Sequence, residues 1–295
     1  MSLPIQLALV SEGVGIDSSS LTSTAAALSK QIQRDFAPIW HVRATIDAFL
    51  KLEDVPTDYW PIIVMQDVQE AAGYHEDKNG QPFAVVQFGD QWSLTASHEC
   101  LEMLADPFGR RMKAANLLEQ AVQLGQKPSR VRYLVEVCDP GESAQFAYQI
   151  NGILVSDFYT PHFFDPVKAS GVRYSYTGAI ESPLMVLDGG YISYEDTVSQ
   201  HWYQVRMFPD EISSDVPHVV DLSAQTAFLK IKATTSLRAA VDRVTKPPQY
   251  RAGLTAEGVI ETQQSADLSA QAQTARAQNL RKELTRLMHP KDGSG

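Results

Sequence analysis

The run SHECLEMLADP at residues 97–107 constrains the fold of this chain more than any other stretch. On a helix that turns about 100° per residue, its leucines share one sector, and its histidine and carboxylates share the adjoining sector. Pro107 disfavours helical geometry at Asp106, the residue before it, and should end the helix there. The sequence therefore predicts a helix over 92–106 with one face packed on a core and one face that carries ionisable groups.

The spacing of the ionisable groups indicates a metal site. His98 and Glu102 lie one turn apart, about 6 Å along the axis, so their side chains can converge on one ion. Glu99 lies next round the helix and is placed to act as a general base toward a water molecule. Asp106 is about 12 Å from His98 along the axis, which is too far to share the ion on a regular helix. We assign Asp106 a supporting role, either orienting a ligand or closing the helix end.

A site with two ligands from one helix needs a third ligand from elsewhere in the fold. The best source is the run LVEVCDP at residues 134–140, which belongs to a strand predicted over 132–138. Its Glu136 and Asp139 are both candidates, and the sequence does not separate them. A buried carboxylate needs a partner, and either a metal ion or a cationic side chain would serve.

The motif also has an ordinary interpretation, in which His98 and the carboxylates form a solvated face paired with Arg110 and Arg111. Three further residues are candidates for supporting roles around a cleft. His75, expected in a loop, would stabilise an oxyanion, and Tyr159 would donate a hydrogen bond to a tetrahedral intermediate. His162 would line a pocket wall. The ordinary alternatives are a surface loop for His75 and packing for the other two.

The composition is that of a globular protein, since 44% of the 295 residues are hydrophobic. A net charge of −10 with no block of Lys or Arg argues against nucleic acid or an anionic membrane as the partner. The two cysteines, Cys100 and Cys138, are too few for a disulfide framework and favour a reducing compartment. Residues 1–15 lack the features of a signal peptide, and no apolar stretch reaches the ~20 residues of a transmembrane helix. We therefore expect a cytoplasmic protein.

Hydrophobic periodicity predicts the elements around the motif helix. Before it, the chain should form strands over 5–10, 41–49, 59–65 and 82–88 and a helix over 18–36. This order indicates a helix layer packed against a sheet. After it, we predict a helix over 112–124, the strand over 132–138, a hairpin around Asn151-Gly152, and one strand and one helix over 219–244.

The composition changes at Lys246-Pro247-Pro248, after which aromatic residues become rare. We therefore divide the chain into a core domain, 1–245, and a flexible or helical tail, 246–295. Residues 266–288 carry leucines at roughly helical spacing. This helix either docks loosely or binds a partner protein or a second copy of the chain.

On these residues the chain resembles the zincin-like metallopeptidases, in a variant with H-E-x-x-E in place of H-E-x-x-H. It is also similar to a group of bacterial, fungal and plant proteins that includes the Exordium-like proteins. There, a His-Glu-x-x-Glu helix that ends at Asp/Asn-Pro is followed by a Glu-x-x-Asp segment. The matching residues are His98, Glu99, Glu102, Asp106-Pro107, Glu136 and Asp139. Gly73-Tyr74-His75 and Val155-Ser156-Asp157-Phe158 are also similar, and the resemblance spans 5–164.

The resemblance implies a zincin-like α+β fold: a mixed sheet beside an active-site helix, then an irregular β-rich part and a helical tail. By this analogy 82–88 is the edge strand that pairs with an extended peptide substrate. The implied activity is that of a zinc-dependent hydrolase, with one zinc ion held by His98, Glu102 and either Glu136 or Asp139, and with Glu99 as the base.

The glutamate at position 102 departs from the two-histidine pattern. Its carboxylate adds negative charge and makes the ion a weaker Lewis acid. The added oxygen ligand also brings Ca²⁺, Mn²⁺ and Mg²⁺ into consideration. The competing hypothesis is a non-catalytic zincin-like scaffold whose 266–288 helix binds a partner.

Overall fold

The computed structural model describes residues 3–68, 72–208, 217–233, 235–245, 278, 281–282 and 284–285. The first half of the chain forms β1 (Ile5–Glu12), α1 (Ser18–Lys30), a π-helical continuation η1 (Gln31–Phe36), α2 (Ala37–Trp40), β2 (Ala44–Phe49), β3 (Trp60–Met65), β4 (Gly73–Lys78), β5 (Gln81–Gln87) and α3 (Trp92–Ala105). The second half forms β6 (Met112–Asn116), α4 (Glu119–Gln123), β7 (Arg130–Leu134), β8 (Tyr148–Ile150), β9 (Ile153–Val155), β10 (Tyr191–Asp196), β11 (Trp202–Arg206), β12 (His218–Asp221), α5 (Thr226–Lys232) and α6 (Leu237–Val244). Short 3₁₀ turns lie at Leu52–Asp54, Asp139–Gly141, Pro161–Phe164 and Leu222–Ala224.

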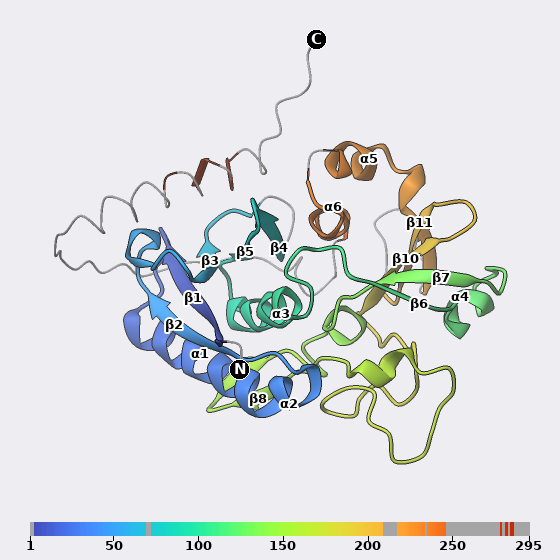
Figure 1. Ribbon diagram of the computed structural model, residues 1–295, viewed down its shortest axis with the longest axis horizontal. Helices are drawn as coiled ribbons and strands as arrows, with labels where there is room; N and C mark the ends of the chain where they lie inside the picture. The colour runs from blue at the N-terminus through green and yellow to red at the C-terminus, as the bar shows by residue number, and fades with distance from the viewer. Residues whose placement is uncertain are drawn as a thin grey trace, which may run out of the picture.

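The first sheet has the strand order β2-β1-β3-β5-β4 (Figure 1). Its first four strands are parallel, and β4 runs antiparallel to β5. The two join through Asn79 and Gly80, whose φ angles of 54° and 80° suit a tight hairpin turn. The fold is therefore α+β with a mixed sheet. The prediction that 82–88 is an edge strand is wrong. This segment is β5, an inner strand, and the polar strand β4 forms the edge.

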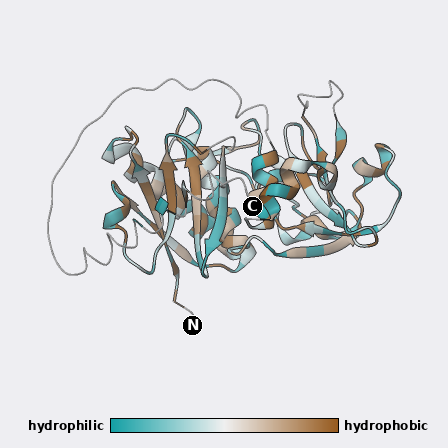
Figure 2. Cartoon of the chain, turned by 90° about the horizontal axis from the view of Figure 1, so that it is seen from above, coloured by the Kyte–Doolittle hydropathy of each residue, from teal (hydrophilic) through white to brown (hydrophobic). Residues whose placement is uncertain are grey.

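Alternate side chains of the first sheet pack on opposite faces, as the two-residue period of a strand requires. Leu7, Leu9 and Val86 belong to a large core that α1 and α3 share, whereas Val10 and Val85 belong to a smaller core on the other face. Figure 2 shows hydrophobic residues concentrated along these strands. Helix α3 therefore lies against the sheet with its long axis near β4 and β5, which positions the motif.

The second sheet is antiparallel, with the order β12-β11-β10-β7-β6. The C-terminal part is thus more regular than the sequence analysis expects. The helix predicted over 112–124 is wrong, because 112–116 pairs with β7 as a strand and only 119–123 is helical. The strand predicted over 132–138 ends at Leu134, so Glu136 follows it in a loop. The sequence predicts one strand and one helix over 219–244, and the structure has the strand β12 and the two helices α5 and α6 there.

The hairpin around Asn151-Gly152 is confirmed as β8 and β9. Of the tail, only 278, 281–282 and 284–285 are described, and the rest of the predicted 266–288 helix lies outside the described residues. Leu284 is 2% exposed and packs with the smaller core of the first sheet. Arg281 forms ion pairs with Glu12 and Glu53. A search of the described residues found no helix with the length and apolar character needed to cross a membrane.

Candidate metal centre

The ionisable face of α3 is buried. The exposed fractions of His98, Glu99 and Glu102 are 4%, 3% and 0%. Arg111 instead donates to the backbone oxygen of Ala105 at 2.9 Å, at the end of the helix. The prediction of a solvated face is therefore wrong, because the loop that follows β7 and helix α6 cover this side of α3. Buried ionisable groups need partners, and the neighbouring elements supply them.

Three ligand atoms converge at the middle of α3. The Nε2 atom of His98 lies 3.2 Å from Oε2 of Glu102 and 3.2 Å from Oδ1 of Asp139. Ligand atoms bonded to one tetrahedral zinc ion at about 2.0–2.2 Å lie about 3.3 Å apart. The distances from His98 to Glu102 and from His98 to Asp139 are therefore compatible with ligands of one ion.

The neighbouring backbone and side chains hold the remaining carboxylate oxygens. Oε1 of Glu102 accepts a hydrogen bond from the Cys138 backbone N–H at 3.0 Å, and Oδ2 of Asp139 pairs with Nη1 of Arg238 at 3.2 Å. Such outer contacts fix the direction in which a ligand oxygen points. Between the two candidates for a third ligand, the structure brings Asp139 to His98 and pairs Glu136 with Arg238.

Arg238 of α6 is the residue at this site that the sequence analysis misses. It is fully buried, and its guanidinium pairs with Glu102, Glu136 and Asp139. Gly109 makes room for it, because a Cβ atom there would lie 2.8 Å from Cβ of Arg238. The spacing of Arg238 and Asp242 is that of a common surface ion pair on a helix, so the sequence carries no signal that marks it.

The centre holds more negative than positive charge. The six buried carboxylates are Glu99, Glu102, Glu136, Asp139, Glu142 and Asp242. Among the described residues, one guanidinium and the imidazoles of His75 and His98 face them. A buried carboxylate without a counter-charge either takes up a proton or binds a cation.

Burial, together with this charge imbalance, shifts the pKa values of the groups at the centre. Burial raises the pKa values of Glu136, Glu142 and Asp242 well above their usual range, despite the attraction of Arg238. Burial also opposes ionisation of Glu102, but Arg238 and His98 outweigh it and hold the pKa of Glu102 low. Burial opposes charge on His98, yet Glu102 and Asp139 raise its pKa well above the usual value.

Several atoms at the centre are buried without a hydrogen-bond partner. They are Nδ1 of His98, Oε2 of Glu99, Oε1 of Glu136, Oδ1 of Asp139, Oε1 of Glu142 and the hydroxyl of Tyr159. Native proteins leave few such atoms, and a bound cation is one accepted explanation for a cluster of them. Imidazole and carboxylate are also ordinary ligands of divalent cations. The residues present therefore fit a divalent metal ion.

The supporting residues divide into three that lie at the centre and one that does not. His75 is a buried residue of β4 rather than of a loop; Nδ1 lies 3.5 Å from Oε2 of Glu99, and Nε2 lies 3.0 Å from the backbone oxygen of Asp106. Asp106 ends α3, where its carboxylate accepts a hydrogen bond from the Arg111 N–H. Tyr159 is buried, and burial together with nearby carboxylates raises its pKa. His162 is 58% exposed and pairs with Asp165 at 2.9 Å, outside the centre.

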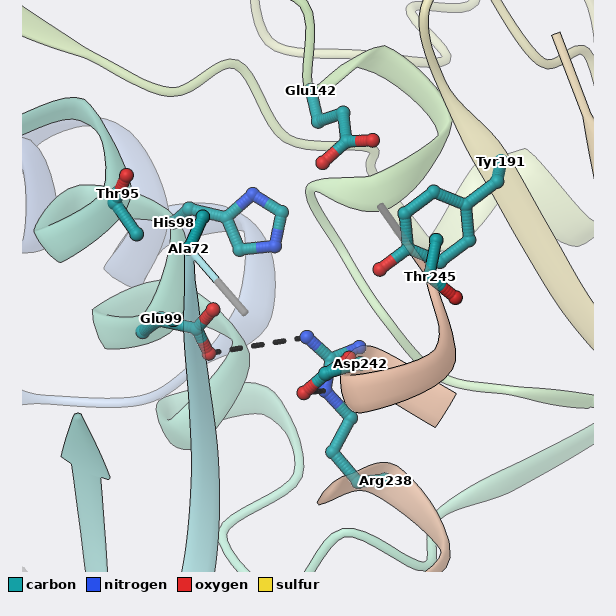
Figure 3. A pocket seen from close by; sticks show the side chains of 10 residues that line it. Ala72, Thr95, His98, Glu99, Glu142, Tyr191, Arg238, Asp242 and Thr245 are labelled. Atoms are coloured by element: carbon teal, nitrogen blue, oxygen red, sulfur yellow. Dashed lines mark ion pairs between the residues drawn. The ribbon is translucent and has the colours of Figure 1, made fainter. Parts of the chain in front are cut away.

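A pocket opens beside the converging atoms (Figure 3). It is lined by Ala72, Gly73, Thr95, His98, Glu99, Glu142, Tyr191, Arg238, Asp242 and Thr245. Gly73 is needed at the start of β4, because a Cβ atom there would lie 2.8 Å from Cγ2 of Thr95 and 3.0 Å from Glu99. Glu142, Tyr191 and Asp242 are lining residues that the sequence analysis does not single out. They come from parts of the chain far from the motif.

Comparison with known proteins adds no relative: no protein-family model, curated protein or solved structure matches this chain. The function must therefore be argued from the geometry and chemistry of the site itself.

Proposed function

We propose that this protein is a metal-dependent hydrolase, and specifically a zinc metallopeptidase of zincin-like architecture. His98, Glu102 and Asp139 would hold the ion, and Glu99 would act as the general base. One observation carries the proposal: in a buried cluster with excess negative charge, Nε2 of His98 lies 3.2 Å from an oxygen of Glu102 and 3.2 Å from an oxygen of Asp139. The arrangement of a mixed sheet, an antiparallel edge strand and a motif helix beside that edge supports the zincin-like assignment.

Glu99 suits the role of base because its carboxylate is near the ligands but is not held by them. It lines the pocket, and its Oε2 atom accepts no hydrogen bond. Nδ1 of His75 at 3.5 Å and Nη2 of Arg238 at 3.9 Å keep this oxygen directed inward. A zinc ion bound beside it would polarise a substrate carbonyl and lower the pKa of a water molecule. Glu99 would then take the proton from water and pass it to the departing amine.

Elemental analysis and a Glu99→Gln variant test this proposal together. We expect the purified full-length protein to contain about one equivalent of zinc per chain after dialysis. His98→Ala should lose that zinc. Glu99→Gln should keep the zinc and lose hydrolysis of a mixed peptide library by at least about 100-fold, because a positioned base contributes 10²–10⁴-fold.

Matched controls make the result decisive. Glu119 is exposed on α4, so Glu119→Gln should change neither zinc content nor hydrolysis. Stoichiometric Ca²⁺, Mn²⁺ or Mg²⁺ in place of zinc would replace the ion named here. No bound metal in the wild-type protein, or full hydrolysis by Glu99→Gln, would refute the proposal.

A further inference from the structure

Glu142 is a buried carboxylate that the proposed reaction does not use. It is 3% exposed, its Oε1 atom accepts no hydrogen bond, and no ion pair joins it to a cation among the described residues. It lines the pocket beside the ligands. Figure 3 shows its carboxylate pointing into the pocket from the side opposite α6. A group buried in this way costs free energy unless a cation meets it there.

A second carboxylate faces the same pocket. Asp242 of α6 is 5% exposed and lines it, with Oδ2 at 2.9 Å from Nε of Arg238 (Figure 3). Arg238 is already shared with Glu102, Glu136 and Asp139. One guanidinium does not balance these four carboxylates. The pocket walls therefore favour a positively charged group.

The pocket is small. It leaves about 20 Å³ in which the centre of a water-sized group can lie, which is room for about one such group. An ammonium group has that size.

The edge of the first sheet is also occupied beside the pocket. The backbone N–H of Ser236, which caps α6, donates to Oε1 of Glu76 at 2.9 Å, and the guanidinium of Arg243 lies 4.8 Å from the ring of Tyr74. Both partners are residues of β4, and Arg238 of the same helix reaches Glu99 on α3. Helix α6 therefore lies along β4, where an extended substrate would otherwise add a strand. This arrangement favours binding the end of a chain.

The position of Glu142 relative to the ligands suits the first residue of a peptide. In that residue a single carbon separates the amine nitrogen from the carbonyl carbon of the first peptide bond. A group that binds the amine must therefore lie next to the group that binds the carbonyl. Single ligand atoms of Glu142, His98 and Asp139 lie within 4.8 Å of one another.

We propose that this pocket, with Glu142 and Asp242 as its carboxylates, binds the protonated amino terminus of a peptide substrate. The inference rests on the proposed peptidase function and names its substrate class: the protein removes the first residue of a peptide. In that reaction the oxygen of water bonds to the first carbonyl carbon as the peptide C–N bond breaks. One proton of water goes to the departing nitrogen, so a free amino acid and a shortened peptide leave.

Binding of glycinamide and N-acetylglycinamide tests the inference without any need for turnover. The two probes differ in the charge of the amine, and calorimetric titration into the full-length protein, with and without zinc, measures both. We expect glycinamide to bind and the acetylated probe to bind at least about tenfold more weakly, since acetylation removes the charge that strengthens the hydrogen bond to the carboxylate. Glu142→Gln, which keeps the size of the side chain, should lower glycinamide affinity about tenfold, and Glu119→Gln should not.

The outcomes separate this inference from the proposed function. Equal binding of both probes by the wild-type protein, with zinc bound and peptides cleaved, would overturn the inference alone. A second equivalent of metal that disappears in Glu142→Gln would also overturn it, because Glu142 would then be a metal ligand. Glycinamide binding that depends on Glu142 in a protein without zinc would support the cation pocket and refute the metallopeptidase. Because the probe comparison needs no variant, misfolding of Glu142→Gln would leave the test intact.

Discussion

At the scale of single residues, the centre depends on which carboxylates meet which cation. Asp139 contacts the His98 imidazole with one oxygen and Arg238 with the other, whereas Glu136 contacts Arg238. Asp139 can therefore serve as a ligand and Glu136 as the group that holds Arg238. The two acids are three positions apart in one loop, and their roles differ because the turn at Asp139–Gly141 redirects the chain.

This difference predicts how two similar variants behave. Asp139→Asn should weaken zinc binding by more than about 100-fold, because loss of a ligand exceeds the 10–100-fold loss seen for outer contacts. Glu136→Gln should stay within that 10–100-fold range. Competition with a chelating dye measures both affinities. The reverse order would make Glu136 the third ligand.

The buried ion pairs of Arg238 should also contribute to the stability of the folded protein. Replacement by Met leaves the buried carboxylates without their guanidinium, and breaking a buried ion pair costs about 3–5 kcal/mol. Arg238→Met should therefore lower the free energy of unfolding of the metal-free protein by about that much, as measured by urea denaturation. Exposed Arg110 is the control, and Arg110→Met should cost less than about 0.5 kcal/mol. Equal effects of the two variants would show that the buried network contributes nothing to stability.

At the scale of elements, α6 completes the centre from a distant part of the chain. It packs along β4, and its approach to the end of α3 depends on Gly109, which has a φ of +58°. No side chain fits between Gly109 and the Cβ atom of Arg238. The close contact therefore makes the position of α6 sensitive to a single methyl group.

Two alanine variants separate the effect of the close contact at Gly109 from the effect of backbone strain. Gly109→Ala and Gly171→Ala both place alanine at a positive φ, which costs about 1–2 kcal/mol, but only at Gly109 does the new methyl meet another residue. We expect Gly109→Ala to cost at least about 1 kcal/mol more than Gly171→Ala in urea denaturation, from the overpacking against Arg238. It should also weaken zinc binding. Equal costs would mean that α6 moves away freely.

At the scale of the whole molecule, α3 packs on the first sheet, and the described part of the tail packs on the opposite face of that sheet. Leu284 is nearly fully buried there, and Arg281 pairs with Glu12 and Glu53. The tail thus contacts its own core domain at these residues. Ion pairs of half-exposed groups add little stability, so the buried leucine should dominate this contact.

We therefore expect the Leu284→Ala variant to be measurably less stable than the wild-type protein. Removal of a buried leucine costs about 2–5 kcal/mol, and we expect a loss in that range. Thr285→Ala, at the exposed neighbouring position, is the control. Thermal unfolding followed by circular dichroism checks both. An unchanged midpoint for Leu284→Ala would indicate that the tail contributes nothing to the fold.

Much of the first sheet and the motif helix could be predicted from sequence because their patterns are local. The continuous apolar runs of β1 and β3 and the proline after Asp106 each act within a few residues. The predictions failed where local pattern and tertiary pairing disagree. The polar strand β4 is stabilised by its pairing with β5, and β6 is a strand because it pairs with β7, although its residues also suit a helix.

The sequence by itself determined that His98, Glu99 and Glu102 share one face of one helix, because helical spacing alone places them there. Only the tertiary structure decided that this face is buried, that Asp139 meets His98, and that Arg238, Glu142 and Asp242 join them. Those contacts link residues far apart in the chain, and their energy depends on burial and charge balance. Burial and charge balance are set only in the folded chain, where the first sheet, the loop after β7 and α6 surround α3.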